Sequence, residues 1–329
     1  MSETVLKVEH LKKYYPVRRG AFSGGAGQVV RACDDVSFEL HAGEVLGIVG
    51  ESGCGKTTTM QSVVRLIEPT DGNITLCGQN FRALRGKALK KARQRIKLIF
   101  QDPYSSLNPR MTVGEIIAEP LDVAKVCKTR TEREERVLQM MTQVGLDPSF
   151  AGRYPHEFSG GQRQRIGIAR AMILHPDVVV CDEPVSALDV SIQAKIINLL
   201  RQLQRELGTA YVFISHDLGV VRHIADRVLV MYLGRVVEEG SCRDVFAHPA
   251  HPYTQALLAS MPRIDGKSDN AEPLTGDVPS PSNPPGGCLF HTRCPYCRDI
   301  CRTASPELIG EDSHLCACHF TGQLPQRKE

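Results

Sequence analysis

Short apolar or alternating runs in this chain are separated by longer stretches in which apolar residues recur every three or four positions. Short runs bounded by polar or turn-forming residues are typical of strands, and the longer spacing is typical of amphipathic helices. The predicted strands are residues 5–11, 36–40, 45–49, 73–77, 96–100, 177–181 and 210–214. The predicted helices are residues 57–66, 86–95, 162–174, 192–207 and 218–225, and residues 112–145 form a longer helical stretch.

The alternation of strands with helices predicts an α/β fold, with a largely parallel, twisted sheet that is covered on both faces. The stretch 112–145 is then a helical insertion between strands of one sheet. Its second half is strongly charged on one face, and Leu138, Met141 and Val144 form the opposite, apolar face.

Two stretches follow neither pattern. Residues 18–27 are rich in glycine and small side chains, which predicts a loop. Residues 265–287 are dominated by Pro, Gly, Ser and Asn, which predicts an irregular linker. We therefore expect a main domain over residues 1–260, with a helical subdomain over about 102–167, and an irregular, cysteine-rich extension over 261–329.

Composition adds few constraints. The chain has 329 residues, of which 42% are hydrophobic and 23% are charged, as in ordinary globular proteins. A net charge of +3 gives no reason to expect nucleic acid as a partner. The apolar runs are far shorter than the roughly 18 residues that cross a bilayer, and the start lacks a secretory signal pattern. We expect a cytoplasmic chain that contacts a membrane only through partners.

The clearest candidate for chemistry follows the predicted strand 45–49. The sequence there is Gly50-Glu51-Ser52-Gly53-Cys54-Gly55-Lys56-Thr57, and Thr58 continues into the predicted helix. This pattern between a strand and a helix indicates a phosphate-binding loop. Its glycines let successive N–H groups point into one concavity, and the helix start adds partial positive charge. We expect Lys56 to reach the β- and γ-phosphates of a bound nucleotide, and the Thr57 hydroxyl to ligate Mg²⁺.

A pair of acidic residues, Asp182 and Glu183, follows the apolar strand 177–181. In open α/β sheets, ligands bind beyond the carboxyl ends of the strands. Asp182 can hold Mg²⁺ there, and Glu183 can accept a proton from an attacking water. Two acids at a strand end can also be plain surface residues, but the phosphate-binding loop upstream favours the catalytic interpretation.

A second helix start suited to anions lies further along the chain. Ser159 is suited to cap this helix, and Gly160 and Gly161 expose backbone N–H groups just before Gln162. Because the helix follows the insertion, its start should lie away from the phosphate-binding loop of the same molecule. A head-to-tail pair of molecules could close both around one nucleotide.

The stretch Phe158–Gln162 resembles the signature sequence of the ATP-binding cassette family, usually written LSGGQ, with Phe158 in the first place. The resemblance covers nearly the whole chain and implies a P-loop ATPase fold with ATP and Mg²⁺ as ligands. It implies roles for four further residues: Gln101 contacts Mg²⁺ or the lytic water, Asp189 lies in the loop that crosses the dimer interface, His216 contacts the γ-phosphate, and Tyr15 stacks on adenine. Tyr14 is an alternative to Tyr15, and core packing is an alternative for either ring.

Three stretches narrow the resemblance. Residues 102–110, 251–258 and the tail from Asn283 onward are similar to the ATPase subunits of bacterial dipeptide and oligopeptide importers. That group also includes nickel and glutathione importers, and chains of the second-ATPase, dipeptide type are the most similar. One departure is Thr57-Thr58, where the group more often has Ser-Thr; either hydroxyl can ligate Mg²⁺.

The resemblance implies an ATPase that powers peptide uptake from the cytoplasmic face of the inner membrane. Its implied partners are a second cassette ATPase, two transmembrane permeases and an extracytoplasmic substrate-binding protein. Nickel or glutathione uptake stays open, because the binding protein and permeases carry most of the solute specificity. A soluble cassette ATPase of translation or DNA repair is a further alternative. Such proteins typically carry two cassettes or a long inserted coiled coil, and this sequence has neither.

The cysteines are unevenly placed, since six of the twelve lie between residues 288 and 318. Such a cluster in a reducing compartment indicates metal binding before disulfides. Cys288, Cys294, Cys301 and Cys318 supply four soft ligands, suited to an iron-sulfur cluster or to zinc. The family resemblance implies a [4Fe-4S] cluster in at least some members of this group, and these four cysteines are the candidate ligands in this chain. Cys294 and Cys297 also form a reasonable half-site for zinc, and unligated thiols are a third alternative.

Overall fold

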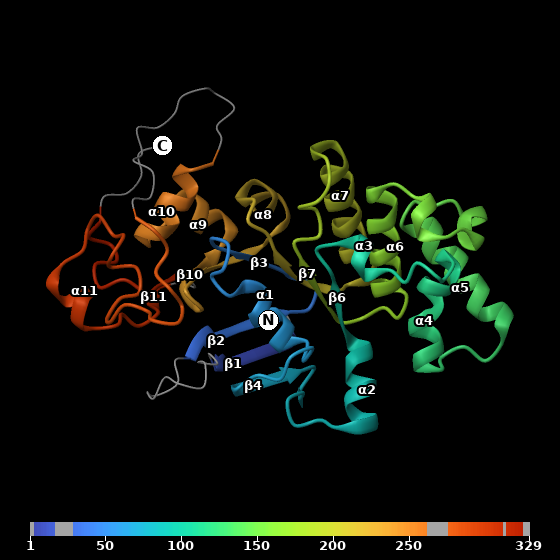
Figure 1. Ribbon diagram of the computed structural model, residues 1–329, viewed down its shortest axis with the longest axis horizontal. Coiled ribbons are helices and arrows are strands. Elements are labelled where there is room, and N and C mark those ends of the chain that lie inside the picture. Colours follow the sequence, from blue (N-terminus) through green and yellow to red (C-terminus); the bar gives the residue numbers. More distant parts are fainter. Residues whose placement is uncertain (1–2, 17–28, 262–275, 312–313, 325–329) are drawn as a thin grey trace, which may run out of the picture. The chain divides into compact units, whose positions relative to one another are not determined.

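The computed structural model describes residues 3–16, 29–261, 276–311 and 314–324. The loop predicted over 18–27 lies outside the described residues, and so does the first part of the predicted linker, 265–275. The chain divides into two compact units, whose elements are labelled in Figure 1. The first unit consists mainly of Thr75–Ile214, and the second mainly of Lys7–Phe38, Leu46–Ile74 and Ser215–Glu329.

Three parallel strands in the order β8-β7-β6 form the sheet of the first unit. They are β6 (Ile96–Ile99), β7 (Val178–Asp182) and β8 (Ala210–Ile214). Every residue of β7 and β8 is buried, so both faces of these strands are covered. This burial explains why their sequences are continuous apolar runs and do not alternate.

Helices make up most of the rest of the first unit. They are α2 (Gly86–Arg95), α3 (Pro103–Ser106), α4 (Val113–Ala124), α5 (Arg130–Gln143), α6 (Gly160–Met172) and α7 (Val190–Leu207), with short 3-10 helices η1 (Pro148–Gly152) and η2 (Pro155–Glu157) and the short strand β5 (Gln79–Asn80). Helix α4 packs against α5 and α6. The side chains of Thr112 and Thr129 cap α4 and α5 by accepting hydrogen bonds from the backbone N–H groups of Glu115 and Glu132.

The apolar face predicted for residues 132–144 is partly wrong. Leu138 is 40% exposed, whereas Val137, Met140 and Met141 are buried. The buried residues continue to Val144 at the helical spacing of three and four, and Leu138 lies about 100° away from that stripe.

The second unit contains a mixed group of strands. Strand β3 (Val45–Val49) runs parallel to β9 (Arg227–Tyr232), which pairs antiparallel with β10 (Arg235–Ser241). Three further strands are neighbours in the order β2-β1-β4, and most of their residues belong to this unit. They are β1 (Thr4–Pro16), β2 (Val29–His41) and β4 (Asp71–Leu76). Its helices are α1 (Lys56–Val63), α8 (Leu218–Ile224), α9 (Cys242–Ala247), α10 (Pro252–Ala259) and α11 (Asp299–Thr303).

The carboxyl-terminal extension is more regular than the sequence predicts. Its strand β12 (His314–Cys316) pairs with β10, and β11 (Ile309–Glu311) pairs with β12. The buried carboxylate of Glu238 on β10 accepts hydrogen bonds from the backbone N–H of Ala250 at 2.7 Å, from that of His251 at 2.9 Å and from the His314 ring at 2.8 Å. A buried charge needs such partners, so Glu238 ties the start of α10 and the extension to the sheet.

No helix in the described ranges is both long enough and apolar enough to span a bilayer.

Candidate functional site

The loop predicted to bind phosphate connects β3 to α1. Its glycines are required by the backbone: φ is 150° at Gly50 and 103° at Gly55, values that other residues rarely adopt. A Cβ atom at Gly50 would lie 2.3 Å from the Met231 carbonyl oxygen, and one at Gly55 would lie 2.0 Å from the Ala32 carbonyl oxygen. The backbone of the loop therefore packs closely against β2 and β9. At the start of α1, the N-cap residue Gly55 has no side chain that could accept a hydrogen bond from the backbone N–H groups of the first turn. Helix starts of this kind favour anions.

Lys56 is the first residue of α1, and only 5% of its surface is exposed. Its Nζ donates hydrogen bonds to the carbonyl oxygens of Gly50 at 2.7 Å and Glu51 at 2.9 Å. The ammonium group thus lies inside the curl of the loop, where a phosphate-binding lysine is required.

Two further side chains contact this loop, and the sequence pattern does not predict either contact. The hydroxyl of Tyr253, on α10, accepts a hydrogen bond from the Glu51 backbone N–H at 2.7 Å. The guanidinium of Arg293, in the extension, donates two hydrogen bonds to the Glu51 carboxylate at 2.7 and 3.0 Å. Both residues are far from the loop in sequence, so no local pattern connects them with it.

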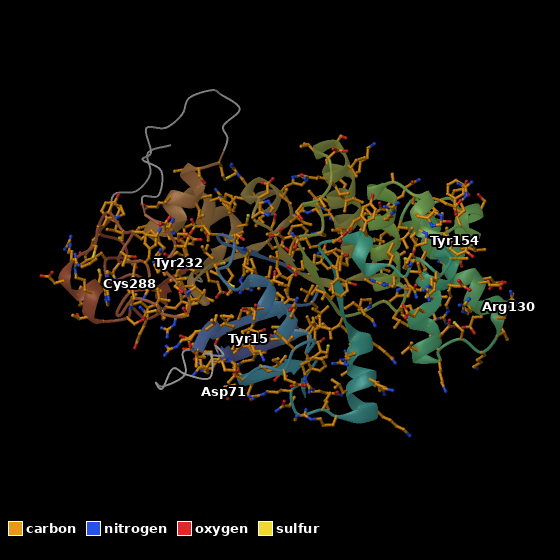
Figure 2. The ribbon with its side chains drawn as sticks, viewed as in Figure 1. Tyr15, Asp71, Arg130, Tyr154, Tyr232 and Cys288 are labelled. Atoms are coloured by element: carbon orange, nitrogen blue, oxygen red, sulfur yellow. The ribbon has the colours of Figure 1, made fainter. Side chains whose placement is uncertain are left out.

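The two tyrosines at the end of β1 differ in their surroundings. The Tyr14 hydroxyl donates to Asp34, which also pairs with Arg235 at 2.8 Å, so this side chain belongs to a structural network. Burial and the bond to Asp34 raise the pKa of Tyr14 to about 12. Tyr15, which is labelled in Figure 2, is 39% exposed. The Lys13 ammonium lies 5.0 Å from the centroid of its ring. The exposed ring of Tyr15 is the better stacking surface.

The acidic pair lies at the carboxyl end of β7, as expected. Asp182 is 6% exposed, and Glu183 has a φ of 45°, an unusual conformation for a residue other than glycine. The Nε2 group of Gln101 donates to a Glu183 carboxylate oxygen at 2.9 Å and to the Ser186 hydroxyl at 3.5 Å. Gln101 and Glu183, 82 residues apart, therefore meet in the first unit. Strained backbone at such a position is common at catalytic residues.

The signature stretch forms the start of α6. The Ser159 hydroxyl accepts from the Gln162 backbone N–H at 3.4 Å, and the Gln162 side chain accepts from the Ser159 N–H at 3.0 Å, which confirms the predicted cap. A Cβ atom at Gly161 would lie 2.6 Å from the Ile192 side chain, so this glycine also allows α7 to approach; at Gly160 the nearest atom would be 3.4 Å away.

The remaining predicted residues also lie at element ends. Asp189 is exposed and precedes α7, without capping it through its side chain. His216 is exposed in the turn between β8 and α8. Its neighbour Asp217 caps α8 by accepting hydrogen bonds from the N–H groups of Gly219 and Val220. Asp217 is thus a capping residue.

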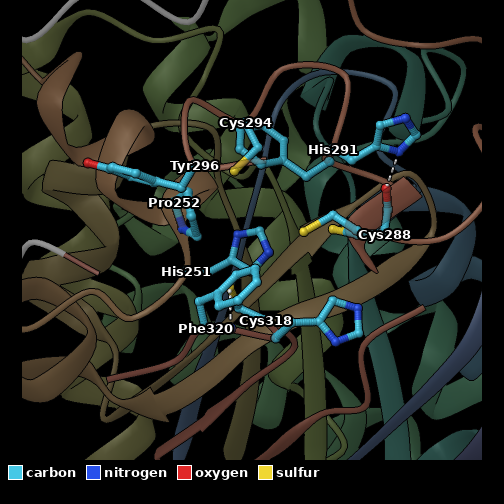
Figure 3. Close-up of a pocket in the computed structure, with 11 residues that line it drawn as sticks. His251, Pro252, Cys288, His291, Cys294, Tyr296, Cys318 and Phe320 are labelled. Atoms are coloured by element: carbon cyan, nitrogen blue, oxygen red, sulfur yellow. Dashed lines mark hydrogen bonds between the residues drawn. The ribbon is translucent and has the colours of Figure 1, made fainter. Parts of the chain in front are cut away.

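Four of the clustered cysteines line one pocket in the second unit. Cys288, Cys294, Cys301 and Cys318 surround it together with aromatic and histidine side chains, whereas Cys297 and Cys316 are not among its lining residues (Figure 3). Burial raises the pKa of Cys288 to about 11 and that of Cys294 to about 12. Within the described ranges, no three His, Cys, Asp or Glu side chains converge closely enough to hold one metal ion. The four thiols line one pocket, but they do not converge on a single point as the ligands of one metal ion would.

A phosphate-binding loop, an acidic strand end with its glutamine, and a capped SGGQ helix on one α/β chain define an ATP-binding cassette ATPase. The model of the ABC transporter family matches residues 33–186, and that of the oligopeptide/dipeptide transporter C-terminal region matches residues 237–301.

Similar proteins extend this match along the whole chain. The oligopeptide transport ATP-binding protein AppF of Bacillus subtilis is 53% identical over 97% of this chain and 98% of its own length. The di/tripeptide transport ATP-binding protein DppF of Pseudomonas aeruginosa is 50% identical over 98% of this chain and 99% of its own. A solved dimeric ATP-binding cassette in a post-hydrolysis state, bound to ADP and phosphate, is 30% identical with a TM-score of 0.64; the match covers 72% of this chain and 99% of that one. The chain belongs to the oligopeptide/dipeptide importer branch of the ATP-binding cassette family and is an ATPase.

Proposed function

We propose that this chain hydrolyses ATP to power the uptake of dipeptides or short oligopeptides. The observation that carries the proposal is that similarity to two peptide-transport ATPases continues through the carboxyl-terminal extension. Residues 251–258, which resemble this group in sequence, also contact the phosphate-binding loop. Tyr253 on α10 accepts a hydrogen bond from the Glu51 N–H, and the His251 N–H before α10 donates to the Glu238 carboxylate. The two relatives reported above are named for oligopeptide and di/tripeptide transport, and nickel or glutathione stays the alternative solute.

The proposed partners are a second, different cassette ATPase, two transmembrane permeases and an extracytoplasmic binding protein. A similar cassette is dimeric in its solved structure, which supports pairing of two ATPases. The signature residues Ser159, Gly160, Gly161 and Gln162, with Asp189 nearby in sequence, would act on ATP held by the loop of the partner ATPase. Contact with the permeases would hold the chain at the cytoplasmic face of the inner membrane.

Within the chain's own site, the loop from Gly50 to Thr58 is proposed to bind the phosphates and Tyr15 to stack on adenine. The oxygen donors of Thr57, Asp182 and Gln101 suit Mg²⁺, which neutralises phosphate charge when bound. Since Gln101 uses its NH₂ group on Glu183, its amide oxygen is the atom that can face a cation or water.

Two residues are proposed to act on the hydrolysis step itself. The Glu183 carboxylate accepts the proton of the attacking water, and Gln101 holds that carboxylate in place through its hydrogen bond. His216 is exposed after β8 and would donate to the γ-phosphate.

We further propose that the cysteine pocket holds a [4Fe-4S] cluster. All four predicted cysteine ligands line this pocket. The two other cysteines between residues 288 and 318, Cys297 and Cys316, are not among its lining residues. A single zinc ion needs its ligands to converge at one point about 2.3 Å from each sulfur, whereas a cluster accepts thiols spread around a larger body. The proposal rests on the four thiols that line the pocket, and zinc and unligated thiols stay the alternatives.

Anaerobic purification tests the cluster. We expect iron and acid-labile sulfide in equal amounts, about four of each per chain. Cys301→Ser should lose both, because it removes a ligand. Cys297→Ser is the matched control and should keep both, because Cys297 does not line the pocket. One equivalent of zinc without iron would refute the cluster.

The transport function is tested by affinity purification of the tagged chain from detergent-solubilised membranes. We expect two polytopic permeases and a second cassette ATPase to co-purify, as identified by mass spectrometry. Ribosomal or DNA-repair proteins in place of permeases would overturn the importer proposal while leaving the ATPase intact. Uptake of labelled dipeptides, nickel and glutathione by cells with and without the gene then identifies the solute.

A further inference from the structure

Glu51 is the second residue of the phosphate-binding loop, and each of its polar groups has a hydrogen-bond partner. Its carboxylate receives two hydrogen bonds from Arg293, its N–H donates to the Tyr253 hydroxyl, and its carbonyl oxygen accepts from Lys56. The two-pronged pair with Arg293 fixes direction as well as distance. The side chain of Arg293 is only 5% exposed and that of Glu51 is 24% exposed, so water screens this pair weakly.

The groups that hold Glu51 are themselves rigidly packed. The rings of Tyr232 on β9, Tyr253 on α10 and Phe290 in the extension are each at most 1% exposed. Their centroids are 4.7 to 5.5 Å apart, and the Arg293 guanidinium lies 6.0 Å from the Tyr232 centroid. These rings, which we call the aromatic platform, give Arg293 and Tyr253 fixed positions. All of these residues belong to the second unit, where Figure 2 labels Tyr232.

An unpaired carboxylate in this loop would weaken ATP binding. The loop must attract phosphates that carry several negative charges, and an unpaired Glu51 would repel them. Arg293 removes this repulsion because it neutralises the carboxylate and holds it in a fixed orientation. The extension therefore supplies a positive charge, in addition to that of Lys56, which offsets the Glu51 carboxylate.

We propose that Arg293 and Tyr253 are positioning residues of the ATP site, and that they act through Glu51. Tyr253 holds the backbone of Glu51, and Arg293 orients and neutralises its carboxylate. The affinity of the loop for ATP thus depends on the docked carboxyl-terminal extension. This inference requires only that the chain binds ATP, and it is independent of the solute and of what the cysteine pocket holds.

The test measures binding of trinitrophenyl-ATP to the purified full chain, in a double-mutant cycle. We expect Arg293→Ala to weaken binding roughly 5- to 30-fold, because it leaves a partly buried carboxylate unpaired beside the phosphates. The double variant should bind ATP as tightly as Glu51→Gln alone, since no carboxylate then needs Arg293. In ATPase assays Arg293→Ala should raise KM more than it lowers kcat. Arg302→Ala is the matched control, an exposed arginine of the same extension, and should leave binding unchanged.

A purely structural role for Arg293 predicts a different result. It would lower the melting temperature in Arg293→Ala and in the double variant alike, without restoring affinity in the double variant. That result, or normal affinity in Arg293→Ala, would overturn the proposal. If Arg293→Ala does not fold, Arg293→Lys replaces it: we expect binding roughly 2- to 5-fold weaker than wild type, because lysine keeps the charge but loses the two-pronged geometry, and wild-type affinity would overturn the proposal. Failure to recover permeases would not affect these measurements.

Discussion

Replacing Glu183 by glutamine is expected to leave ATP binding intact and to lower the hydrolysis rate about 10²- to 10⁴-fold, the usual contribution of a general base. Glutamine has the shape of glutamate, and its amide oxygen can still accept the hydrogen bond that Gln101 now donates at 2.9 Å. The positive φ at this position is kept as well, since the backbone is unchanged. What is lost is the ability to accept a proton from the attacking water.

Phosphate release and binding of trinitrophenyl-ATP together measure this effect. Glu206→Gln is the matched control, because Glu206 is exposed at the end of α7, and both its activity and its binding should stay near those of wild type. A Glu183→Gln variant with near-normal turnover would show that another group is the base. A variant that also loses ATP binding would show that Glu183 holds the loop or the nucleotide in addition.

Strands 45–49 and 210–214 have the predicted bounds, because both are buried throughout and form continuous apolar runs. Helix 86–95 also has the predicted bounds, although Ala92 is its only buried residue. By contrast, β1 and β2 are each 13 residues long, far longer than predicted. The end of β1 at Pro16 and the start of β2 at Val29 are exposed, so a hydrophobic pattern does not mark these ends.

The chemistry of the loop was readable because glycine, lysine and threonine occupy it at fixed spacing. Glu51 stands at a position of the pattern that any residue can fill, so its pairing with Arg293 gave no signal. The spacing of the cysteines was more informative, since the four predicted residues line one pocket. The domain boundaries at residue 260 and over 102–167 stay predictions.

Replacing Lys56 by alanine should have the opposite signature to the Glu183 substitution, because it removes binding. Hydrogen bonds to charged groups contribute about 1.5 to 3 kcal/mol, so we expect ATP affinity to fall roughly 10- to 150-fold. The variant would also leave the carbonyl oxygens of Gly50 and Glu51 without the donor that lies between them, which would loosen the curl of the loop. Lys90→Ala, an exposed lysine on α2, is the matched control for loss of charge and should bind normally.

The substitutions Lys56→Ala and Glu183→Gln together distinguish ATP binding from ATP hydrolysis. If Lys56 binds phosphate and Glu183 acts only on the water, trinitrophenyl-ATP should bind tightly to Glu183→Gln and weakly to Lys56→Ala, while both hydrolyse slowly. Tight binding by Lys56→Ala would mean that the backbone N–H groups of the loop and the start of α1 hold the phosphates without the ammonium. Because Lys56 donates to Glu51, the loss in Lys56→Ala should also be smaller when Arg293 is already replaced.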